Sequence, residues 1–290
     1  MKQNQLQGKI FMLIMEQFNI MVKDNLKRYI SENGNGHILI HSDILFGFKI
    51  KFENHEIFLE EHYEELKAVC QPLKIIMPSF NYNFCKGSPY NLKDSESQVG
   101  TLSEYFRKNK ATWRTSTPVF NFSGIVENPL PIKYGKIDPF DESSLFGFLN
   151  RNNGLLMHYG SGLHTSTLIH YVERISNRLI YRYDKIFKSQ VIDINDVTHE
   201  CELIYHVRPM GYDLNYDWNK LEEDLLENGL IEKYKEKRTQ ILIGRIDKIV
   251  DYWLTCLNNN PFYFLDKDTR NWVEAKFNEL NRPFKLTDFE

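Results

Sequence analysis

The sequence feature that most constrains the fold is a pair of short apolar segments separated by one helical stretch. Residues 37–41 (HILIH) and 74–77 (KIIM) are runs of mainly apolar residues, and Pro78 stops the second run. Between them, the stretch EEHYEELKAVC carries its apolar residues on one side of a helix. Apolar runs without polar alternation are typical of strands that are covered on both faces. A strand, a helix and a second strand with short connections therefore predict a parallel α/β sheet.

Later segments extend this prediction. Residues 154–159 (GLLMHY) are a third predicted strand, which ends in a Gly-Ser-Gly turn, and a helix is expected to begin near Thr165. The pieces RLIYRYDKIF and CELIYHVRPM, within residues 178–217, are hairpin-like, which is typical of an antiparallel addition to the sheet. The remainder of the chain is predicted to be mainly helical. Because the chain has 290 residues and no clear linker, we expect one domain over 1–290, with a possible subdomain at about 178–230.

Composition and charge argue against several classes of protein. The formal net charge is -3, whereas phosphate binding usually leaves a basic balance, so no nucleic-acid partner is expected. No apolar run approaches the roughly 20 residues that span a bilayer, so no membrane partner is expected. The four cysteines are far apart and form no Cys-x-x-Cys pair, which favours reduced thiols. These features predict a cytoplasmic protein. We expect it to be a monomer or a homodimer, a choice that the sequence leaves open.

The densest chemistry in the chain lies in the segment HYGSGLHTSTLIHYVE, from His158 to Glu173. A strand enters a glycine-rich turn there, and ligands of open α/β sheets collect at the carboxyl ends of strands. His170 and Glu173 are spaced to share one helix face, and a carboxylate beside an imidazole fixes its tautomer and raises its pKa. The pair is a candidate general base for an amine that attacks a thioester. By spacing alone, however, a solvated surface pair is the more common occurrence.

Two other kinds of site are compatible with the same segment. His158, His164 and His170 could gather a zinc ion, but they lie six residues apart across a turn and no carboxylate completes a ligand set. We therefore expect no metal. A serine hydrolase could use Ser42 or Ser161, but Ser161 lies in Tyr-Gly-Ser-Gly, which lacks the full Gly-x-Ser-x-Gly nucleophile elbow.

The stretch TLIHYVE, with hydroxyl residues ahead of it, resembles the signature of the aminoglycoside 3-N-acetyltransferase family. Three upstream blocks resemble the family in the same order, namely ILIHSDILFGF at 38–48, IIMPSFNYNFCKGSPYNLKDSESQVGTLSEYFRK at 75–108 and RTSTPVFNFSGI at 114–125. Together with the signature they cover about residues 37–175. The last third of the chain matches the family only loosely.

The resemblance implies a three-layer α/β/α sandwich with a mixed, largely parallel central sheet. It also implies transfer of an acetyl group from acetyl-CoA to a primary amine on a sugar ring. In such an enzyme His170 is the general base and Glu173 orients it, while Thr165 contributes to catalysis and Thr167 to coenzyme binding. The segment after the first strand would line the coenzyme A channel. It consists of His41, Ser42, Asp43, Ile44, Leu45 and Phe46.

The chain departs from the family pattern at several positions. After the first strand it has FGFKIKFENHEIF in place of a stretch with a Gly-Gly pair, and Asp43 stands where a small hydroxyl residue is common. That acidic side chain would lie near the phosphates or the pantetheine of the coenzyme. Thr115 and Thr117 replace the serine and the histidine of the Arg-Ser-x-His-Pro block. These differences fit a changed acceptor pocket and equally fit neutral drift.

The acceptor must be inferred from side-chain chemistry. Enzymes that act on polycationic aminoglycosides usually present an acidic pocket, and this chain is only mildly acidic. Aromatic and amide side chains between Phe80 and Tyr90 would suit a sugar, and Lys86, Lys93 and Arg114 could meet a diphosphate. We expect the acceptor to contact Asn81, Tyr82, Asp94, Glu96, Arg114, Asp213 and Asp217.

These features slightly favour a nucleotide-linked amino sugar of surface-glycan synthesis as the acceptor. The first alternative is an aminoglycoside 3-N-acetyltransferase that confers antibiotic resistance. The second alternative is a non-catalytic relative that binds a coenzyme or a nucleotide. In the first two cases the partners are coenzyme A and a small amine-bearing sugar.

Overall fold

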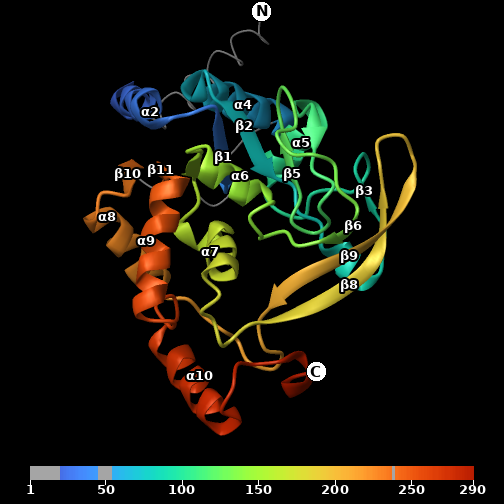
Figure 1. Ribbon diagram of the computed structural model, residues 1–290. Coiled ribbons are helices and arrows are strands. Elements are labelled where there is room, and N and C mark those ends of the chain that lie inside the picture. The colour runs from blue at the N-terminus through green and yellow to red at the C-terminus, as the bar shows by residue number, and fades with distance from the viewer. Residues whose placement is uncertain (1–19, 45–53, 237–238) are drawn as a thin grey trace, which may run out of the picture.

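The centre of the computed structural model, which describes residues 20–44, 54–236 and 239–290, is a seven-stranded sheet (Figure 1). Its strand order is β10-β11-β7-β1-β2-β5-β4. The strands are β10 (Ile231–Glu236), β11 (Thr239–Arg245), β7 (Leu155–Tyr159), β1 (His37–Ser42), β2 (Lys74–Pro78), β5 (Phe122–Gly124) and β4 (Trp113–Arg114). The three strands that the sequence predicts are therefore β1, β2 and β7, and they are adjacent and parallel in the sheet.

Parallel pairing in the described part of this sheet is confined to β2, β1 and β7, where Ile38 lies beside both Ile75 and Leu155. The pairs toward the two edges, β7 with β11, β11 with β10, β2 with β5 and β5 with β4, are antiparallel. The sheet is mixed, as expected, but its parallel part is smaller than the prediction implied. Residues 231–236 and 239–245 were expected to be helical and instead form the paired strands β10 and β11. The segment IEKYKE carries four charged residues and therefore lacks the apolar run that predicts a buried strand. Charged side chains are tolerated there because β10 lies at the edge of the sheet.

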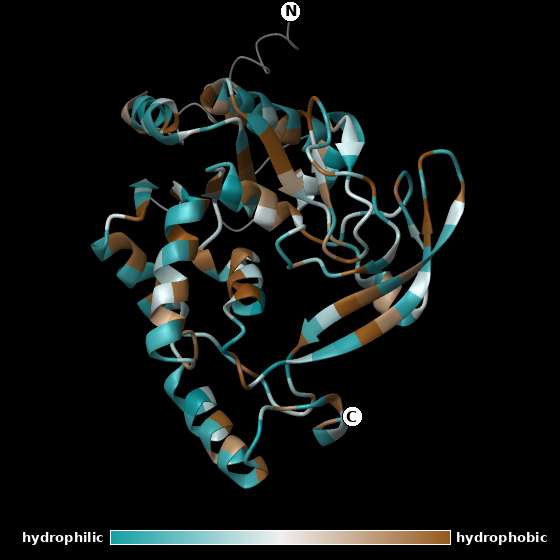
Figure 2. Ribbon diagram, viewed as in Figure 1, coloured by the Kyte–Doolittle hydropathy of each residue, from teal (hydrophilic) through white to brown (hydrophobic). Residues whose placement is uncertain are grey.

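Each face of the central strands is covered by its own apolar cluster, because successive side chains of a strand point to opposite faces. Ile38 and Ile40 pack with the helices α2 (Ile20–Asn33), α4 (His55–Cys70) and α5 (Thr101–Asn109). Leu39 and Leu156 pack on the other face with α6 (Leu145–Arg151), α7 (Leu168–Ser176) and α9 (Ile246–Asn259). Figure 2 shows β1 and β2 as hydrophobic strands between these layers. The predicted three-layer α/β/α sandwich is confirmed.

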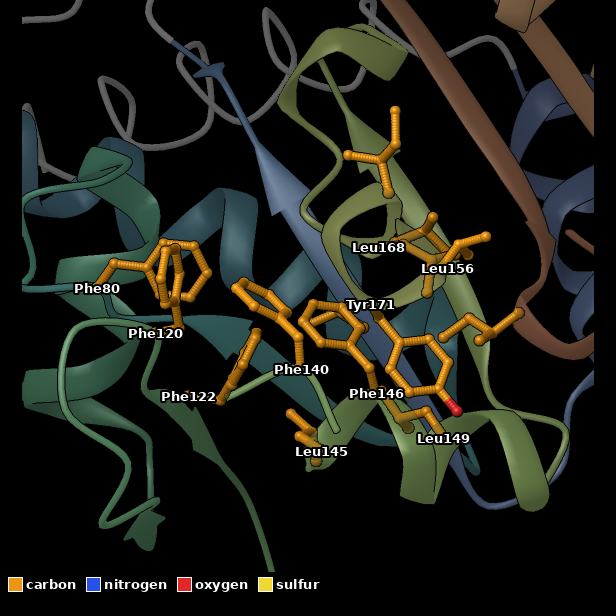
Figure 3. Close-up of a cluster of buried hydrophobic side chains, with 14 of the residues drawn as sticks. Phe80, Phe120, Phe122, Phe140, Leu145, Phe146, Leu149, Leu156, Leu168 and Tyr171 are labelled. Atoms are coloured by element: carbon orange, nitrogen blue, oxygen red, sulfur yellow. The ribbon is translucent and has the colours of Figure 1, made fainter. Parts of the chain in front are cut away.

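The cluster beneath α7 includes a connected set of aromatic rings (Figure 3). Phe120, Phe122, Phe140, Phe146 and Tyr171 are linked by ring contacts with centroid separations from 4.6 to 6.2 Å. Tilted, edge-on and offset ring pairs at such distances add to the free energy gained by burial. Because Tyr171 belongs to α7, this packing fixes the helix that carries the candidate general base.

A second, four-stranded sheet has the order β3-β8-β9-β6. It consists of β3 (Tyr90–Asn91), β8 (Tyr183–Ile192), β9 (Thr198–Val207) and β6 (Gly135–Ile137). The hairpin predicted within 178–217 is confirmed as β8–β9, which extends beside the sandwich in Figure 1. However, it does not join the central sheet, because its edges pair with β3 and β6 from the polar segment that follows β2.

The C-terminal part contains α8 (Trp218–Glu227) and α10 (Lys267–Leu280), and short 3-10 turns are η1 (Tyr82–Lys86), η2 (Leu163–Thr165) and η3 (Leu286–Asp288). A third apolar cluster joins α10 to Tyr181 and Tyr183 through Val273 and Phe284. This cluster ties the last helix to the start of the β8–β9 hairpin. Among the described residues, no helix combines the length and the apolar character that a membrane crossing requires.

Candidate active site

Two cavities lie on either side of the turn that follows β7. The first, of about 460 Å³, is lined by the end of β1, the start of α5 and the hydroxyl residues ahead of α7. The second, of about 540 Å³, is lined by α7, the β8–β9 hairpin and the segment ahead of α8. Thr165 lines the first cavity and the neighbouring His164 lines the second. The turn η2 therefore separates two spaces that a group-transfer enzyme would need for its two substrates.

The first cavity contains the described residues that were expected to bind the coenzyme, namely His41, Ser42, Asp43, Ile44 and Thr167, and also Thr165. Leu45 and Phe46 lie outside the described residues. Three atoms of this set, His41 Nε2, Ser42 Oγ and Thr167 Oγ1, are buried and have no hydrogen-bond partner among the described residues. A buried polar atom without a partner costs free energy. A ligand with polar groups is therefore favoured in this cavity.

Thr165 is held by His158, which the sequence suggested only as a metal ligand. Its Oγ1 lies 3.0 Å from Nδ1 of His158 and donates to the carbonyl of Gly162 at 3.0 Å. The rings of His158 and His41 are stacked at 5.3 Å, because the two residues are register partners on β7 and β1. Burial lowers the pKa of His41 to about 4 and that of His158 well below its ordinary value. Both rings are therefore neutral near pH 7.

The three histidines of the zinc alternative do not come together. His158 lies buried behind the first cavity, His164 is exposed, and His170 lines the second cavity. In the part of the chain that the structure describes, no group of three His, Cys, Asp or Glu side chains is arranged to hold a metal ion. Ser161, the serine of the hydrolase alternative, donates to the backbone carbonyl of His41 at 3.4 Å.

His170 and Glu173 are in contact on α7, with 3.1 Å between Nδ1 and Oε2. The side chain of His170 is 26% exposed, whereas that of Glu173 is fully buried. The carboxylate accepts the Nδ1 proton and so selects the tautomer in which Nε2 carries a lone pair. No described residue is bonded to Nε2. The imidazole therefore offers a proton-accepting nitrogen beside the second cavity.

Glu173 is surrounded by a buried cation and two hydroxyl donors that the sequence did not reveal. Nε of Arg182 lies 2.8 Å from Oε2, and the hydroxyls of Tyr216 and Tyr181 donate to Oε1 at 2.7 and 3.2 Å. Burial alone would raise the pKa of Glu173, but the Arg182 charge and the hydrogen bonds from His170 and Tyr216 outweigh it and lower this pKa to about 2. Glu173 is therefore ionised throughout the neutral range.

The pKa of His170 shifts in the direction opposite to the one expected. Burial lowers it, the hydrogen bond to Glu173 raises it, and the charge of Arg182 lowers it again, so that the net shift is downward. Glu173 does raise the pKa of His170, as expected, but burial and Arg182 lower it by more, so the expected net increase is wrong. The outcome favours an unprotonated imidazole near pH 7, which is the form that a general base requires.

Of the acceptor residues expected from the sequence, Asp213 lines the second cavity and Tyr82 lines the first. The side chain of Asp213 is 86% exposed and lies 4.0 Å from Arg208. Asp217 instead accepts from the backbone of Lys220 and caps α8, which is the ordinary role of an aspartate ahead of a helix.

The other expected acceptor residues are occupied elsewhere in the fold. Arg114 is buried and donates to Asn121, to the carbonyl of Ser79 and to that of Ser95, so it braces the loops around β3. Asn81 caps η1 and donates to the carbonyl of Glu96 at 2.8 Å. Glu96 itself pairs with Lys108, and Asp94 accepts from Asn91. These five residues (Asn81, Asp94, Glu96, Arg114 and Asp217) do not line either of the two cavities.

The fold of this chain is similar to the folds of solved aminoglycoside acetyltransferases. A mutant of aminoglycoside acetyltransferase AAC(3)-IVa in complex with gentamicin is 18% identical, with 86% of this chain and 93% of that chain covered and a TM-score of 0.61. AAC-IIIb in a binary complex with CoASH is 14% identical, with 82% and 96% covered and a TM-score of 0.64. The YokD protein from Bacillus subtilis is 16% identical, with 82% and 94% covered and a TM-score of 0.59. These likenesses show a shared fold.

The sequence comparison defines the family. The model of the aminoglycoside 3-N-acetyltransferase family matches residues 66–258, which is more than half of the chain. The chain therefore belongs to this family, and the resemblance seen in its motifs is confirmed. It is an N-acetyltransferase with acetyl-CoA as the acetyl donor. Among curated proteins, none matches the sequence.

Proposed function

We propose that this enzyme acetylates a primary amine of an aminoglycoside, with acetyl-CoA in the first cavity and the acceptor in the second. The observation that carries the proposal is the position of His170. It lines the second cavity and lies one helical turn after Thr167, which lines the first. A base at this boundary is within reach of an amine that approaches a thioester from the acceptor side.

The residues supply two parts of the reaction. The amine nitrogen of the acceptor bonds to the thioester carbon, and Nε2 of His170 takes a proton from that nitrogen. The carbon–sulfur bond of the thioester then breaks. The proton passes from His170 to the leaving thiolate, which restores the neutral imidazole. Glu173 holds the Nδ1 proton throughout and stabilises the transient imidazolium. The hydroxyl of Thr167 lies at the first cavity without a partner among the described residues, so it can donate to the acetyl carbonyl. Thr165 lines the same cavity, and its hydroxyl would do so after giving up its bond to the Gly162 carbonyl.

The sequence slightly favoured a nucleotide-linked amino sugar as the acceptor, and we now propose the first alternative, an aminoglycoside. The family match and the gentamicin complex of a structural relative both favour an aminoglycoside, and neither supports a nucleotide-linked sugar of surface-glycan synthesis. The residues expected to bind a sugar nucleotide, Arg114 above all, make hydrogen bonds within the protein instead. In the second cavity, Asp213 is the exposed carboxylate available to an ammonium group. Resistance to such antibiotics would follow from this activity.

One observation favours a second candidate acceptor, an amino sugar with a single positive charge. The second cavity is lined by Arg182, Lys185 and Arg208 as well as by carboxylates. Lys185 is paired with Glu290, and Arg208 lies near Asp213. The described lining therefore carries no surplus of negative charge, whereas a polycation is bound best by an acidic pocket.

A panel of acceptors tests the proposed function. With acetyl-CoA and a thiol reagent, we expect thiol release that requires an amine, with gentamicin and apramycin as polycationic acceptors and glucosamine as the singly charged one. Higher kcat/KM for the antibiotics supports the first candidate, and higher kcat/KM for glucosamine supports the second. Thiol release without any amine would instead indicate a hydrolase. Acetyl-CoA binding without thiol release for any acceptor would support the non-catalytic alternative, and absence of both would contradict the proposed function.

Thr167→Val is expected to weaken acetyl-CoA binding without destabilising the free protein. The Thr167 hydroxyl is buried and has no partner among the described residues, so its loss leaves no new unsatisfied group. If the hydroxyl binds the coenzyme, the Kd for acetyl-CoA rises by roughly 5- to 10-fold, the worth of one hydrogen bond. Calorimetry of acetyl-CoA binding and urea unfolding measure the two effects. An unchanged Kd would remove Thr167 from the proposed coenzyme site.

We propose further that the whole chain works as one catalytic domain, because the second cavity is lined by residues from His164 to Glu290. Both cavities are lined within a single chain, so a monomer is a sufficient active unit and a homodimer is equally compatible. A cytoplasmic location is part of the proposal, since the reaction consumes acetyl-CoA.

A further inference from the structure

Arg182 is the buried cation of the candidate active site. It lies between α7 and β8, and its side chain is only 4% exposed. Its Nε lies 2.8 Å from Oε2 of Glu173, and its Nη1 donates to the carbonyl of His206 at 2.8 Å. Its Nη2 bonds to the hydroxyl of Tyr216 and lies 3.4 Å from Nδ1 of His170. One guanidinium therefore touches both members of the catalytic pair.

The contact between Arg182 and His170 brings together two groups that both carry N–H bonds. Nδ1 of His170 gives its proton to Oε2 of Glu173, the same oxygen that faces Nε of Arg182. Nδ1 of His170 is therefore protonated and cannot accept a hydrogen bond from Nη2 of Arg182. If His170 became an imidazolium, two cations would share one buried carboxylate. A like charge at this distance disfavours protonation of the imidazole.

We propose that Arg182 is the positioning residue of this site: its guanidinium holds the Glu173 carboxylate that orients His170 and faces the same imidazole with a permanent positive charge. The inference rests on the proposed role of His170 as general base and adds how that base is kept unprotonated. His170 cannot supply a permanent positive charge to Glu173, because its imidazole is charged only while it carries the proton taken from the amine. An arginine keeps its charge at any accessible pH.

The other titratable and charged groups around His170 do not replace Arg182. On α7 itself the facing group is Glu173, and ahead of β8 stands the buried Tyr181, which donates to the same carboxylate. Tyr216 faces His170 from the segment ahead of α8, and the ring of Phe140 packs against the imidazole at 5.5 Å. Arg208, at the end of β9, is half exposed and is therefore screened by water. Arg182 is thus the one buried cation among the described neighbours.

The test compares Arg182→Gln with wild type in two readouts, an NMR titration of the His170 ring and the pH profile of kcat/KM. In Arg182→Gln we expect the pKa of His170 to rise by about one unit or more, since an adjacent charge shifts a pKa by 1–3 units. A base acts only when unprotonated, so the acid limb of kcat/KM must move to higher pH by the same amount. The loss of rate is then larger at pH 6 than at pH 8.5.

Two further variants separate charge from shape. Arg182→Lys keeps the positive charge but loses the planar contacts to His206 and Tyr216, so we expect a lower kcat with the acid limb near its wild-type position. Tyr216→Phe keeps both charges and removes one hydroxyl, so the His170 titration should again stay near that of wild type. A uniform loss of kcat in Arg182→Gln, with no movement of the acid limb or of the titration, would mean that Arg182 is only structural.

A double variant covers the case in which Arg182→Gln does not fold. Glu173→Gln with Arg182→Gln removes both buried charges together, which costs far less than leaving one unpaired. His170 should titrate at a higher pH in this double variant than in Glu173→Gln, and equal values would overturn the inference. The ring titration needs no turnover. If wild type transfers no acetyl group, the proposed function fails while the effect of Arg182 on His170 is still measured.

Discussion

Replacing His170 with alanine is expected to lower kcat for acetyl transfer by roughly 10²- to 10⁴-fold, the usual contribution of a positioned general base. The physical reason is that Nε2 of His170, which has no partner among the described residues, can accept a proton at the second cavity. The loss should leave folding almost intact, because Glu173 keeps its contacts with Arg182 and Tyr216. Thiol release from acetyl-CoA in the presence of the best acceptor measures kcat.

A neighbouring histidine gives a matched control for this result. His164 also lines the second cavity, but it is exposed and makes no bond to Glu173. His164→Ala should therefore lower kcat far less than His170→Ala does. Acetyl-CoA binding should be nearly unchanged in both variants, since neither side chain lines the first cavity. Similar activity of His170→Ala and wild type would contradict the assignment of the base.

Glu173→Gln is expected to lower kcat by roughly 10²-fold or more, with a much smaller change in acetyl-CoA affinity. An amide can donate to Nδ1 of His170 and so hold the imidazole in the tautomer that cannot accept a proton at Nε2, an effect worth up to about 10⁴ in a related arrangement. The same change leaves Arg182 buried without its carboxylate, which should reduce the free energy of unfolding by about 3–5 kcal/mol. Steady-state kinetics and urea unfolding measure the two effects.

The pH dependence of stability gives an independent check on Glu173. Its pKa in the folded chain is about 2, below the ordinary 4.5, so its ionised form stabilises the fold above about pH 4.5. This contribution is lost as the pH falls through 4.5 toward 2. Wild type should therefore lose unfolding free energy over this window, and Glu173→Gln should lose correspondingly less. Equal losses of kcat and of acetyl-CoA affinity in Glu173→Gln would instead mean that the residue is structural only.

Local sequence patterns were sufficient for the parts of the molecule that depend on neighbouring residues. The apolar runs of β1, β2 and β7 predicted adjacent parallel strands, because strands buried on both faces show no polar alternation. The spacing of His170 and Glu173 predicted a shared helix face, and the two side chains are in contact. The segment from His41 to Ile44 lines one cavity with Thr165 and Thr167, and its role in coenzyme binding stays a prediction.

Other features could not be predicted, since they depend on contacts between distant segments. The hairpin β8–β9 pairs with β3 and β6, two short strands whose residues show no clear pattern of their own. Arg114 looks like a ligand for phosphate in the sequence, yet its donors are used by backbone and amide oxygens of nearby loops. A charged residue reveals its role only when its partners are known.

His170 and Glu173 show the same contrast between features that depend on neighbouring residues and features that depend on distant ones. Helix geometry is a local property, so the sequence alone places His170 and Glu173 on one face of a helix that follows a glycine-rich turn. The burial of the carboxylate, and its contacts with Arg182 and Tyr216, depend on residues that lie 9 and 43 positions further along the chain and come close only in the folded protein. The direction of the His170 pKa shift follows from those contacts and from burial. Both are properties of packing, which no spacing in the sequence encodes.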